Sequence, residues 1–152
     1  MKSCSTLTIV YISQTGQAQA IAESIFDLTT QNNFEAKLFC IKDYEKIYSL
    51  SDETSPIVFI CSTTGDGDLP ETAFKFWNKL KRLNEASGFL KNMKYALLGL
   101  GDTNYTIFCG GPKQLHKKFQ ELGAECFYGP FWADDGTGLD LEVEPFIDGM
   151  IG

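Results

Sequence analysis

The stretch LTIVYISQTGQAQAIAESIF, residues 7–26, places an apolar run, a polar turn and a helical pattern one after another. Residues 7–12 are mostly apolar, which is typical of a strand that is buried on both faces. From residue 18 to residue 28 the apolar side chains recur at the spacing of one helix face. The bend between them contains Ser13, Thr15 and Gly16 and no lysine or arginine. This succession predicts the first β-α unit of a parallel sheet.

The same alternation continues along the chain. Further strands are predicted over residues 36–41, 56–61, 94–100 and 126–128, and further helices over 113–122 and 142–150. Another helix is expected to begin at Pro70, with an apolar face shared by Ala73, Phe74, Trp77 and Leu80. Residues 42–56 read as a polar connection around a short segment at 44–50. Crossovers of this kind are right-handed and predict a parallel sheet with helices on both faces.

Length, charge and composition limit the classes of function. The 152 residues are expected to form a single domain over residues 1–152. The net charge of -7 disfavours binding to nucleic acid or to an anionic membrane and favours a basic partner protein. No apolar run approaches the roughly 20 residues that cross a bilayer. The N-terminus lacks the cleavage site of a secretory signal, so we expect a cytoplasmic protein. We also expect a monomer.

Cysteine and histidine usage argues against a metal site. The five cysteines form an odd set without a C-x-x-C pair, which predicts reduced thiols; they are Cys4, Cys40, Cys61, Cys109 and Cys126. The single histidine, His116, excludes a cluster of imidazole ligands. We therefore expect no metal.

The bend after the first strand has the composition of an anion site. Ser13, Gln14, Thr15, Gly16 and Gln17 would offer hydroxyl and backbone N–H groups at the positive end of a helix dipole. The bend matches neither the Walker A pattern nor G-x-G-x-x-G, because it has one glycine and no lysine. This composition favours a monophosphate held by dipoles and hydrogen bonds. The alternative is an ordinary Ser/Thr helix N-cap.

Three further bends follow the third, fourth and fifth predicted strands. Residues 62–68, STTGDGD, contain two glycines that allow the backbone to approach a flat ligand closely. Residues 99–105, GLGDTNY, offer Tyr105 for stacking on a ring. Residues 132–138, WADDGTG, add an acidic pair. Each bend alone is compatible with a surface turn, but ligands of doubly wound sheets bind at the carboxyl ends of the strands, so together they predict one site.

These motifs carry a resemblance to a known family. SQTGQA, STTGDGDLPETAFKFW, LLGLGDTNYTIFCGG, FQELGAECFYG and ADDGTGLDLEVEPF resemble the flavodoxin-like FMN domain of the diflavin reductases, most closely the methionine synthase reductase branch. The resemblance spans residues 7–149. It implies a three-layer, doubly wound α/β fold with a five-stranded parallel sheet in the order 2-1-3-4-5. It also implies FMN as the cofactor.

The resemblance further implies where FMN binds. The phosphate would lie at Ser13, Gln14, Thr15, Gly16, Gln17 and Ala18. One side of the isoalloxazine would contact Thr63, Thr64 and Gly65. Its other side and edge would contact Gly101, Asp102, Asn104, Tyr105, Phe108 and Cys109, and Ser62 and Leu100 are also expected to bind the cofactor. Tyr105 matches the stacking tyrosine, Asp134 and Asp135 match an acidic pair near the flavin, and Thr64 replaces a second stacking tyrosine of cytochrome P450 reductase.

The function implied by the resemblance is one-electron transfer by bound FMN. Electrons would arrive from an NADPH-reduced FAD module, in an NADPH-dependent diflavin oxidoreductase, and leave to the cobalamin of methionine synthase. FAD and NADPH would bind modules outside these residues. The flavin carries the redox chemistry, so no catalytic residue is expected. Residues 62–71 and 132–148 are acidic without lysine or arginine and predict a docking face around the flavin edge.

Two other function classes are excluded by missing residues. A phosphoryl-receiver domain would need an aspartate after the third strand and a lysine after the fifth, where the chain has Ser62 and Gly129. A serine hydrolase would need the G-x-S-x-G elbow. A stand-alone flavodoxin-type carrier serving another acceptor stays open, as does a flavin-free interaction module.

Overall fold

A five-stranded parallel sheet in the order β2-β1-β3-β4-β5 forms the centre of the computed structural model. The structure describes residues 5–13, 16–43, 56–64, 67–83, 88–102, 109–135, 138 and 140–151. The strands are β1 Ser5–Ile12, β2 Phe34–Cys40, β3 Ile57–Cys61, β4 Lys94–Gly101 and β5 Glu125–Asp134. The predicted fold class and strand order are confirmed. The predicted segment at 44–50 lies outside the described residues.

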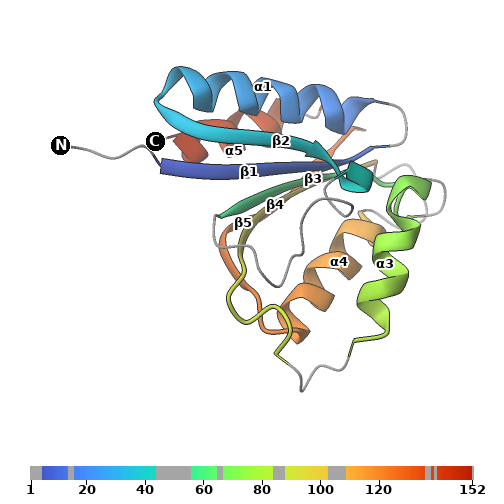
Figure 1. The fold of residues 1–152 in the computed structure, drawn as a ribbon. Helices are drawn as coiled ribbons and strands as arrows, with labels where there is room; N and C mark the ends of the chain where they lie inside the picture. The colour runs from blue at the N-terminus through green and yellow to red at the C-terminus, as the bar shows by residue number, and fades with distance from the viewer. Residues whose placement is uncertain are drawn as a thin grey trace.

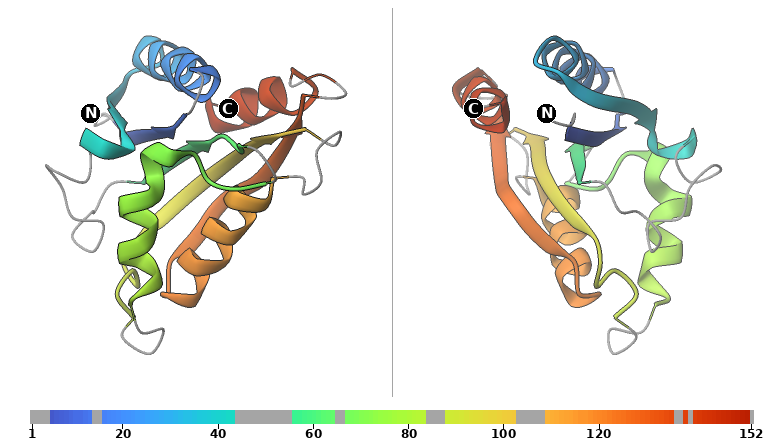
Figure 2. Two further views of the ribbon diagram at one scale, coloured as in Figure 1. Left: turned by 90° about the vertical axis from the view of Figure 1, so that its right-hand side faces the viewer. Right: turned by 60° about the vertical axis from the view of Figure 1, so that its left-hand side comes forward.

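Helices cover both faces of this sheet. They are α1 Gln17–Gln31, α3 Phe74–Lys81, α4 Gly110–Glu121 and α5 Asp140–Ile151, with a 3-10 turn, η2 Glu71–Ala73, before α3. Figure 1 shows α1 and α5 on one face and α3 and α4 on the other, and Figure 2 shows the same layers from two further sides. No described helix is both long and apolar enough to cross a membrane.

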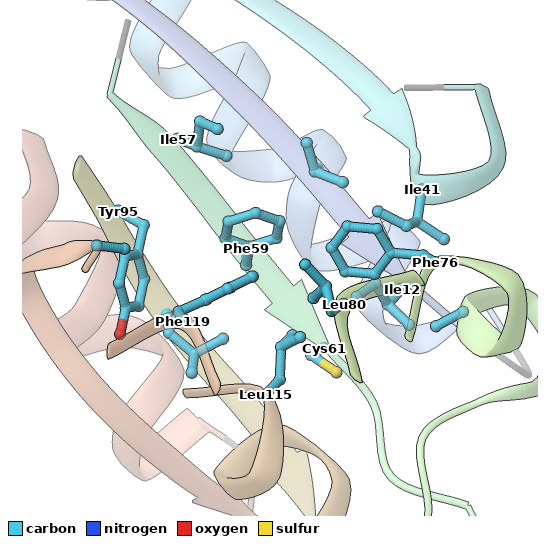
Figure 3. Close-up of a cluster of buried hydrophobic side chains, with 14 of the residues drawn as sticks. Ile12, Ile41, Ile57, Phe59, Cys61, Phe76, Leu80, Tyr95, Leu115 and Phe119 are labelled. Carbon is cyan, nitrogen blue, oxygen red and sulfur yellow. The ribbon is translucent and has the colours of Figure 1, made fainter. Parts of the chain in front are cut away.

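Strand β3 is buried along its whole length and contributes to two cores. Its side chains alternate between the faces of the sheet, so Ile57, Phe59 and Cys61 pack with residues of α3 and α4. Val58 and Ile60 pack with residues of α1 and α5. Figure 3 shows the first of these cores, in which Phe59 from β3 lies beside Phe119 of α4. The continuous apolar run of a central parallel strand follows from this double burial.

The prediction for the fifth strand is too short. It covers residues 126–128, whereas β5 extends from Glu125 to Asp134 and includes Gly129 and Pro130. The register with β4 shifts twice there: Tyr95, Ala96 and Leu98 pair with Cys126, Tyr128 and Phe131, so β5 carries two extra residues. Proline is tolerated at a bulge and in an edge strand, and β5 is both bulged and at the edge. The residues 132–134 therefore belong to the strand and not to the loop.

The predicted apolar face of α3 is wrong at one position. Phe74 is 50% exposed, and Phe76 is buried in its place together with Ala73 and Leu80. The 3-10 turn of η2 has three residues per turn and rotates the following helix relative to a continuous α-helix. Trp77 stays at the border of the buried face, where it packs against the core.

Helix α4 begins earlier than predicted, at Gly110 and not at residue 113. Two glycines followed by a proline resemble a loop, but Pro112 lies in the first turn, where its missing N–H removes no intrahelical bond. The residue before the helix, Cys109, is buried and has a left-handed backbone with φ 51°.

The aromatic cluster under α3 and α4 is expected to dominate stability. The ring centroid of Phe119 lies 4.9 Å from that of Phe59 and 5.0 Å from that of Tyr95. Phe119→Ala would leave a cavity and lower the free energy of unfolding by about 3–5 kcal/mol in urea denaturation. The matched change Phe127→Ala, at a side chain that is 44% exposed, would cost less than about 1 kcal/mol. Equal losses for the two variants would contradict this packing.

Candidate functional site

The loop between β1 and α1 presents an uncapped helix terminus. The Gly16 N–H donates a hydrogen bond to Ser13 Oγ at 2.8 Å. Gly16 has φ 98°, and a Cβ built there would meet no atom within 4 Å, so the loop opens to free space. No side chain of a described residue caps α1, and its first turn contains no acidic residue. The first N–H groups of the helix are therefore available to an anion.

Four hydrogen bonds join the ends of different strands and the segments that follow them. The Ser62 N–H donates to the Ile12 carbonyl at 2.9 Å, and the Asp135 N–H donates to the Gly101 carbonyl at 2.8 Å. Two threonine hydroxyls complete the set, with Thr63 Oγ1 donating to the Leu100 carbonyl at 2.7 Å and Thr72 Oγ1 to the Ser13 carbonyl at 3.1 Å. The carboxyl ends of β1, β3, β4 and β5 are thereby fixed relative to one another.

The loop after β3 folds back on itself and rests on α4. The Thr64 N–H donates to the Asp68 carbonyl and the Asp68 N–H donates to the Thr64 carbonyl, both at 2.9 Å. A Cβ at Gly111 would lie 2.6 Å from the Leu69 nitrogen and 2.8 Å from the Asp68 carbonyl carbon. Only glycine allows the loop backbone to approach α4 this closely.

Ser62 carries an unpaired polar atom at this edge of the sheet. Its side chain is buried, with 8% of its surface exposed, and its Oγ has no hydrogen-bond partner among the described residues. A buried hydroxyl without a partner costs about 1–3 kcal/mol. Ser62 lies directly after β3, and its N–H is bonded to Ile12 at the end of β1. A polar ligand at the carboxyl edge would give this hydroxyl a partner.

Cys109 shares an environment with residues of three loops. Burial raises the pKa of the Cys109 thiol to about 11; the Lys113 ammonium and a hydrogen bond with Thr63 oppose the rise, and the Asp134 carboxylate adds to it. These influences place Thr63, Cys109 and Asp134 close together. The raised pKa keeps Cys109 a neutral thiol near pH 7, so it offers a polar contact and no nucleophile.

All of the predicted site residues that the structure describes lie at this edge. Ser13, Gly16, Gln17 and Ala18 lie at the start of α1, and Ser62, Thr63 and Thr64 follow β3. Leu100, Gly101 and Asp102 lie at the end of β4, Cys109 at the start of α4, and Asp134 at the end of β5. The remaining predicted residues lie outside the described part of the chain; they are Gln14, Thr15, Gly65, Asn104, Tyr105 and Phe108.

Three further residues of the edge were not predicted from the sequence. Thr72 ties the loop of β3 to that of β1, Gly111 supports the loop of β3, and Lys113 influences Cys109. Thr72 and Lys113 resemble ordinary residues of a first helical turn, so no sequence signal marks them. The pair Gly110-Gly111 was a usable signal, because glycine is costly inside a helix unless close packing requires it.

Among the described residues, this edge offers neither a histidine nor a cluster of metal ligands. Within the described ranges no group of three metal-ligating side chains is present, and the described cysteines, Cys40, Cys61, Cys109 and Cys126, are free. His116 lies against Tyr95, whose hydroxyl is 2.8 Å from His116 Nδ1, near the start of β4 and away from the carboxyl edge. The edge therefore has the features of a binding site for a polar, anionic ligand.

Sequence comparisons identify relatives of the whole chain. Methionine synthase reductase of Mus musculus is 47% identical over 142 residues, which are 93% of this chain and 20% of the relative. NADPH-dependent diflavin oxidoreductase 1 of Schizosaccharomyces pombe is 38% identical over 125 residues, 81% of this chain and 21% of the relative. The chain thus spans about a fifth of the length of these curated relatives.

A comparison with solved structures and a family model agree with the relatives found by sequence. A mutant flavodoxin of Fusobacterium nucleatum, solved with bound flavin mononucleotide, superposes with a TM-score of 0.74 at 16% identity, over 97% of this chain and 94% of that one. The family model described as flavodoxin matches residues 9–147. The family resemblance inferred from the sequence is confirmed, and the chain belongs to the flavodoxin family.

Proposed function

We propose that residues 1–152 form one domain that binds FMN at the carboxyl edge of the sheet and transfers single electrons. The unpaired Ser62 hydroxyl carries this proposal, because it is a buried polar atom that lacks a partner among the described residues at the predicted ligand site. The open, uncapped start of α1 supports it independently. Family membership and the flavin mononucleotide of the Fusobacterium flavodoxin point to the same ligand.

The phosphate of FMN would bind at the start of α1. In this proposal the Ser13 hydroxyl shapes the loop through its bond to Gly16, and the N–H groups of Gln17 and Ala18 donate to the phosphate. Gln14 and Thr15 would add side-chain contacts. Because no lysine or arginine lies in the loop, the helix dipole and hydrogen bonds supply the attraction.

The isoalloxazine would lie between the loops that follow β3 and β4. One side is assigned to Ser62, Thr63, Thr64 and Gly65, and the other side and edge to Leu100, Gly101, Asp102, Asn104, Tyr105, Phe108 and Cys109. The hydrogen bond from Thr63 to the Leu100 carbonyl holds these two loops in a fixed relation. Asp134, half-buried beside Cys109, would complete the pocket from β5.

Bound FMN would supply one- and two-electron redox chemistry, and the protein would tune it through charge. Asp68 and Asp135 are exposed on loops around the proposed ring site, and Asp134 is half-buried at the end of β5. Fixed negative charge disfavours added negative charge in a partly desolvated site. These carboxylates would therefore make full reduction of the cofactor less favourable and support delivery of electrons to an acceptor.

The proposed partners follow from the names of the relatives. An FAD module reduced by NADPH would supply electrons, and the cobalamin of methionine synthase would accept them, as in a cytoplasmic NADPH-dependent diflavin oxidoreductase. The domain would act as a monomer. Its docking face would include the exposed Asp68, Glu71 and Asp135. Glu144 and Asp148, also predicted for this face, are exposed on α5, but Asp148 acts on Tyr128 near the start of β5, away from the carboxyl edge. Asp66 lies outside the described residues, and the side chains of Asp140 and Glu142 are not described.

The Ser62 hydroxyl provides the direct test. Ser62→Ala is expected to weaken FMN binding about tenfold in a flavin-fluorescence titration, because one hydrogen bond is lost. The same change should leave the FMN-free chain as stable as before, or about 1 kcal/mol more stable, because it removes an unsatisfied buried group. Ser24→Ala, on the exposed face of α1, should leave the affinity unchanged. A Ser62→Ala chain that binds FMN normally would refute the assigned contact.

The open turn at Gly16 provides a second test. Gly16→Ala is expected to lower FMN affinity by at least about tenfold, because φ 98° is strained for alanine and the loop must move. Gly88→Ala is the matched control, since Gly88 also has a positive φ of 59° and a Cβ there would make only ordinary contacts at 3.9 Å with the Lys91 side chain, but it precedes β4 at the opposite edge. Equal effects of the two variants on FMN binding would show that α1 does not hold the ligand.

The acidic docking face predicts salt-sensitive electron transfer. The rate from the FMN-loaded chain to methionine synthase should fall at least about fivefold between roughly 0.05 and 0.5 M ionic strength. The pair Asp68→Asn with Asp135→Asn should flatten this dependence. The control pair is Glu35→Gln with Glu125→Gln, which removes two exposed carboxylates from other strands and should leave the dependence unchanged. Rates independent of salt would contradict electrostatic docking.

A further inference from the structure

The two helical layers carry opposite charge. Helices α3 and α4 contain six lysines and one glutamate, whereas α1 and α5 contain six carboxylates and no lysine or arginine. These pairs of helices lie on opposite faces of the sheet (Figures 1 and 2). The chain therefore has a basic face although its net charge is -7. The proposed flavin site, with its acidic loops, gives no reason for this face.

A hollow on the basic face brings together an indole ring, three ammonium groups, an amide and a carboxylate. It has a volume of about 320 Å³ and lies between α3 and α4, lined by Trp77, Lys81, Gln114, Lys117, Lys118 and Glu121. Trp77 and Lys81 are four residues apart, so they lie on one side of α3. The four residues from α4 are spaced by three or four and share the side of α4 that faces them. We call this surface the α3–α4 hollow.

The lysines of the hollow are available to an external anion. Lys81 and Lys117 are exposed, and the side chain of neither forms a hydrogen bond or ion pair with another described residue. Lys118 is half-buried and donates to the Leu83 carbonyl at 3.3 Å, which fixes its ammonium group beside the end of α3. Neighbouring cations raise the local potential, and one carboxylate, Glu121, does not neutralise three of them.

The composition of the lining indicates the kind of ligand. The half-buried Trp77 packs against the core and leaves part of its ring as an apolar platform between cations. None of the six described lining residues is an arginine, the side chain suited to bidentate binding of phosphate. Lysines around an aromatic ring suit carboxylates that flank an apolar side chain. The hollow also lies along the helices, beyond the first turns that border the carboxyl edge.

We propose that the α3–α4 hollow binds an acidic segment of a partner protein. An apolar side chain of that segment rests on Trp77, and its carboxylates pair with Lys81 and Lys117. Because the hollow is separate from the carboxyl edge, this contact leaves the proposed flavin site accessible. The partner is held by one face while the edge of the sheet engages another molecule. The proposal does not depend on flavin binding.

The test uses a synthetic acidic heptapeptide, Glu-Glu-Leu-Glu-Asp-Glu-Glu, and amide chemical shifts of the full chain without flavin. We expect shifts confined to α3 and α4. The double variant Lys81→Gln with Lys117→Gln should weaken the peptide roughly tenfold, since each exposed ion pair contributes about two- to fivefold. Lys42→Gln with Lys94→Gln changes the net charge equally at other exposed sites and should have no effect. Replacing the leucine of the peptide by glycine should weaken binding further.

Four results would overturn the proposal. They are shifts outside α3 and α4, equal weakening by the two double variants, equal affinity for the leucine and glycine peptides, and the same shifts with inorganic tripolyphosphate at equal affinity. The last result would make the hollow a site for small polyanions. Shifts of α3 and α4 on dilution without peptide would instead assign the face to a second copy of this chain.

Discussion

The parallel pairing of β3 with β1 and β4 is the constraint on which the rest of the structure depends. All five residues of β3 are buried, so both faces need a helical layer, and each layer requires a crossover that returns to the same end of the sheet. Every strand therefore ends at one edge. Four hydrogen bonds of 2.7–3.1 Å join the strand ends and the segments that follow them, so that these segments form one surface.

The proposed binding at this edge relies on no lysine or arginine of the loop before α1. Among the described residues no side chain caps α1, its first turn has no acidic residue, and the Ser62 hydroxyl is buried without a partner. Dipoles and hydrogen bonds suit a monophosphate ester with a polar chain, and acidic side chains around the edge keep its surroundings negative. Charge is instead concentrated in the helical layers, which carry opposite signs on the two faces.

Local patterns predicted the parts of the fold that local interactions determine. The β1-turn-α1 unit and the position of the described loop residues follow from apolar periodicity and motif, whereas the strand order follows from the family resemblance. The errors occur where long-range contacts decide. The bulge in β5 depends on its pairing with β4, and the exposure of Phe74 depends on the 3-10 turn before α3. Thr72 and Gly111 join the site through partners 59 residues away and in a neighbouring loop, respectively, which no short motif records.

The central claim is that the start of α1 binds the phosphate of FMN at the edge of the sheet. The most direct measurement is calorimetric titration of the chain with FMN and, separately, with riboflavin, which lacks the phosphate. The account predicts that FMN binds at least about a hundredfold more tightly, because the helix terminus contributes only when the phosphate is present. Equal affinities, or binding of neither compound, would contradict it.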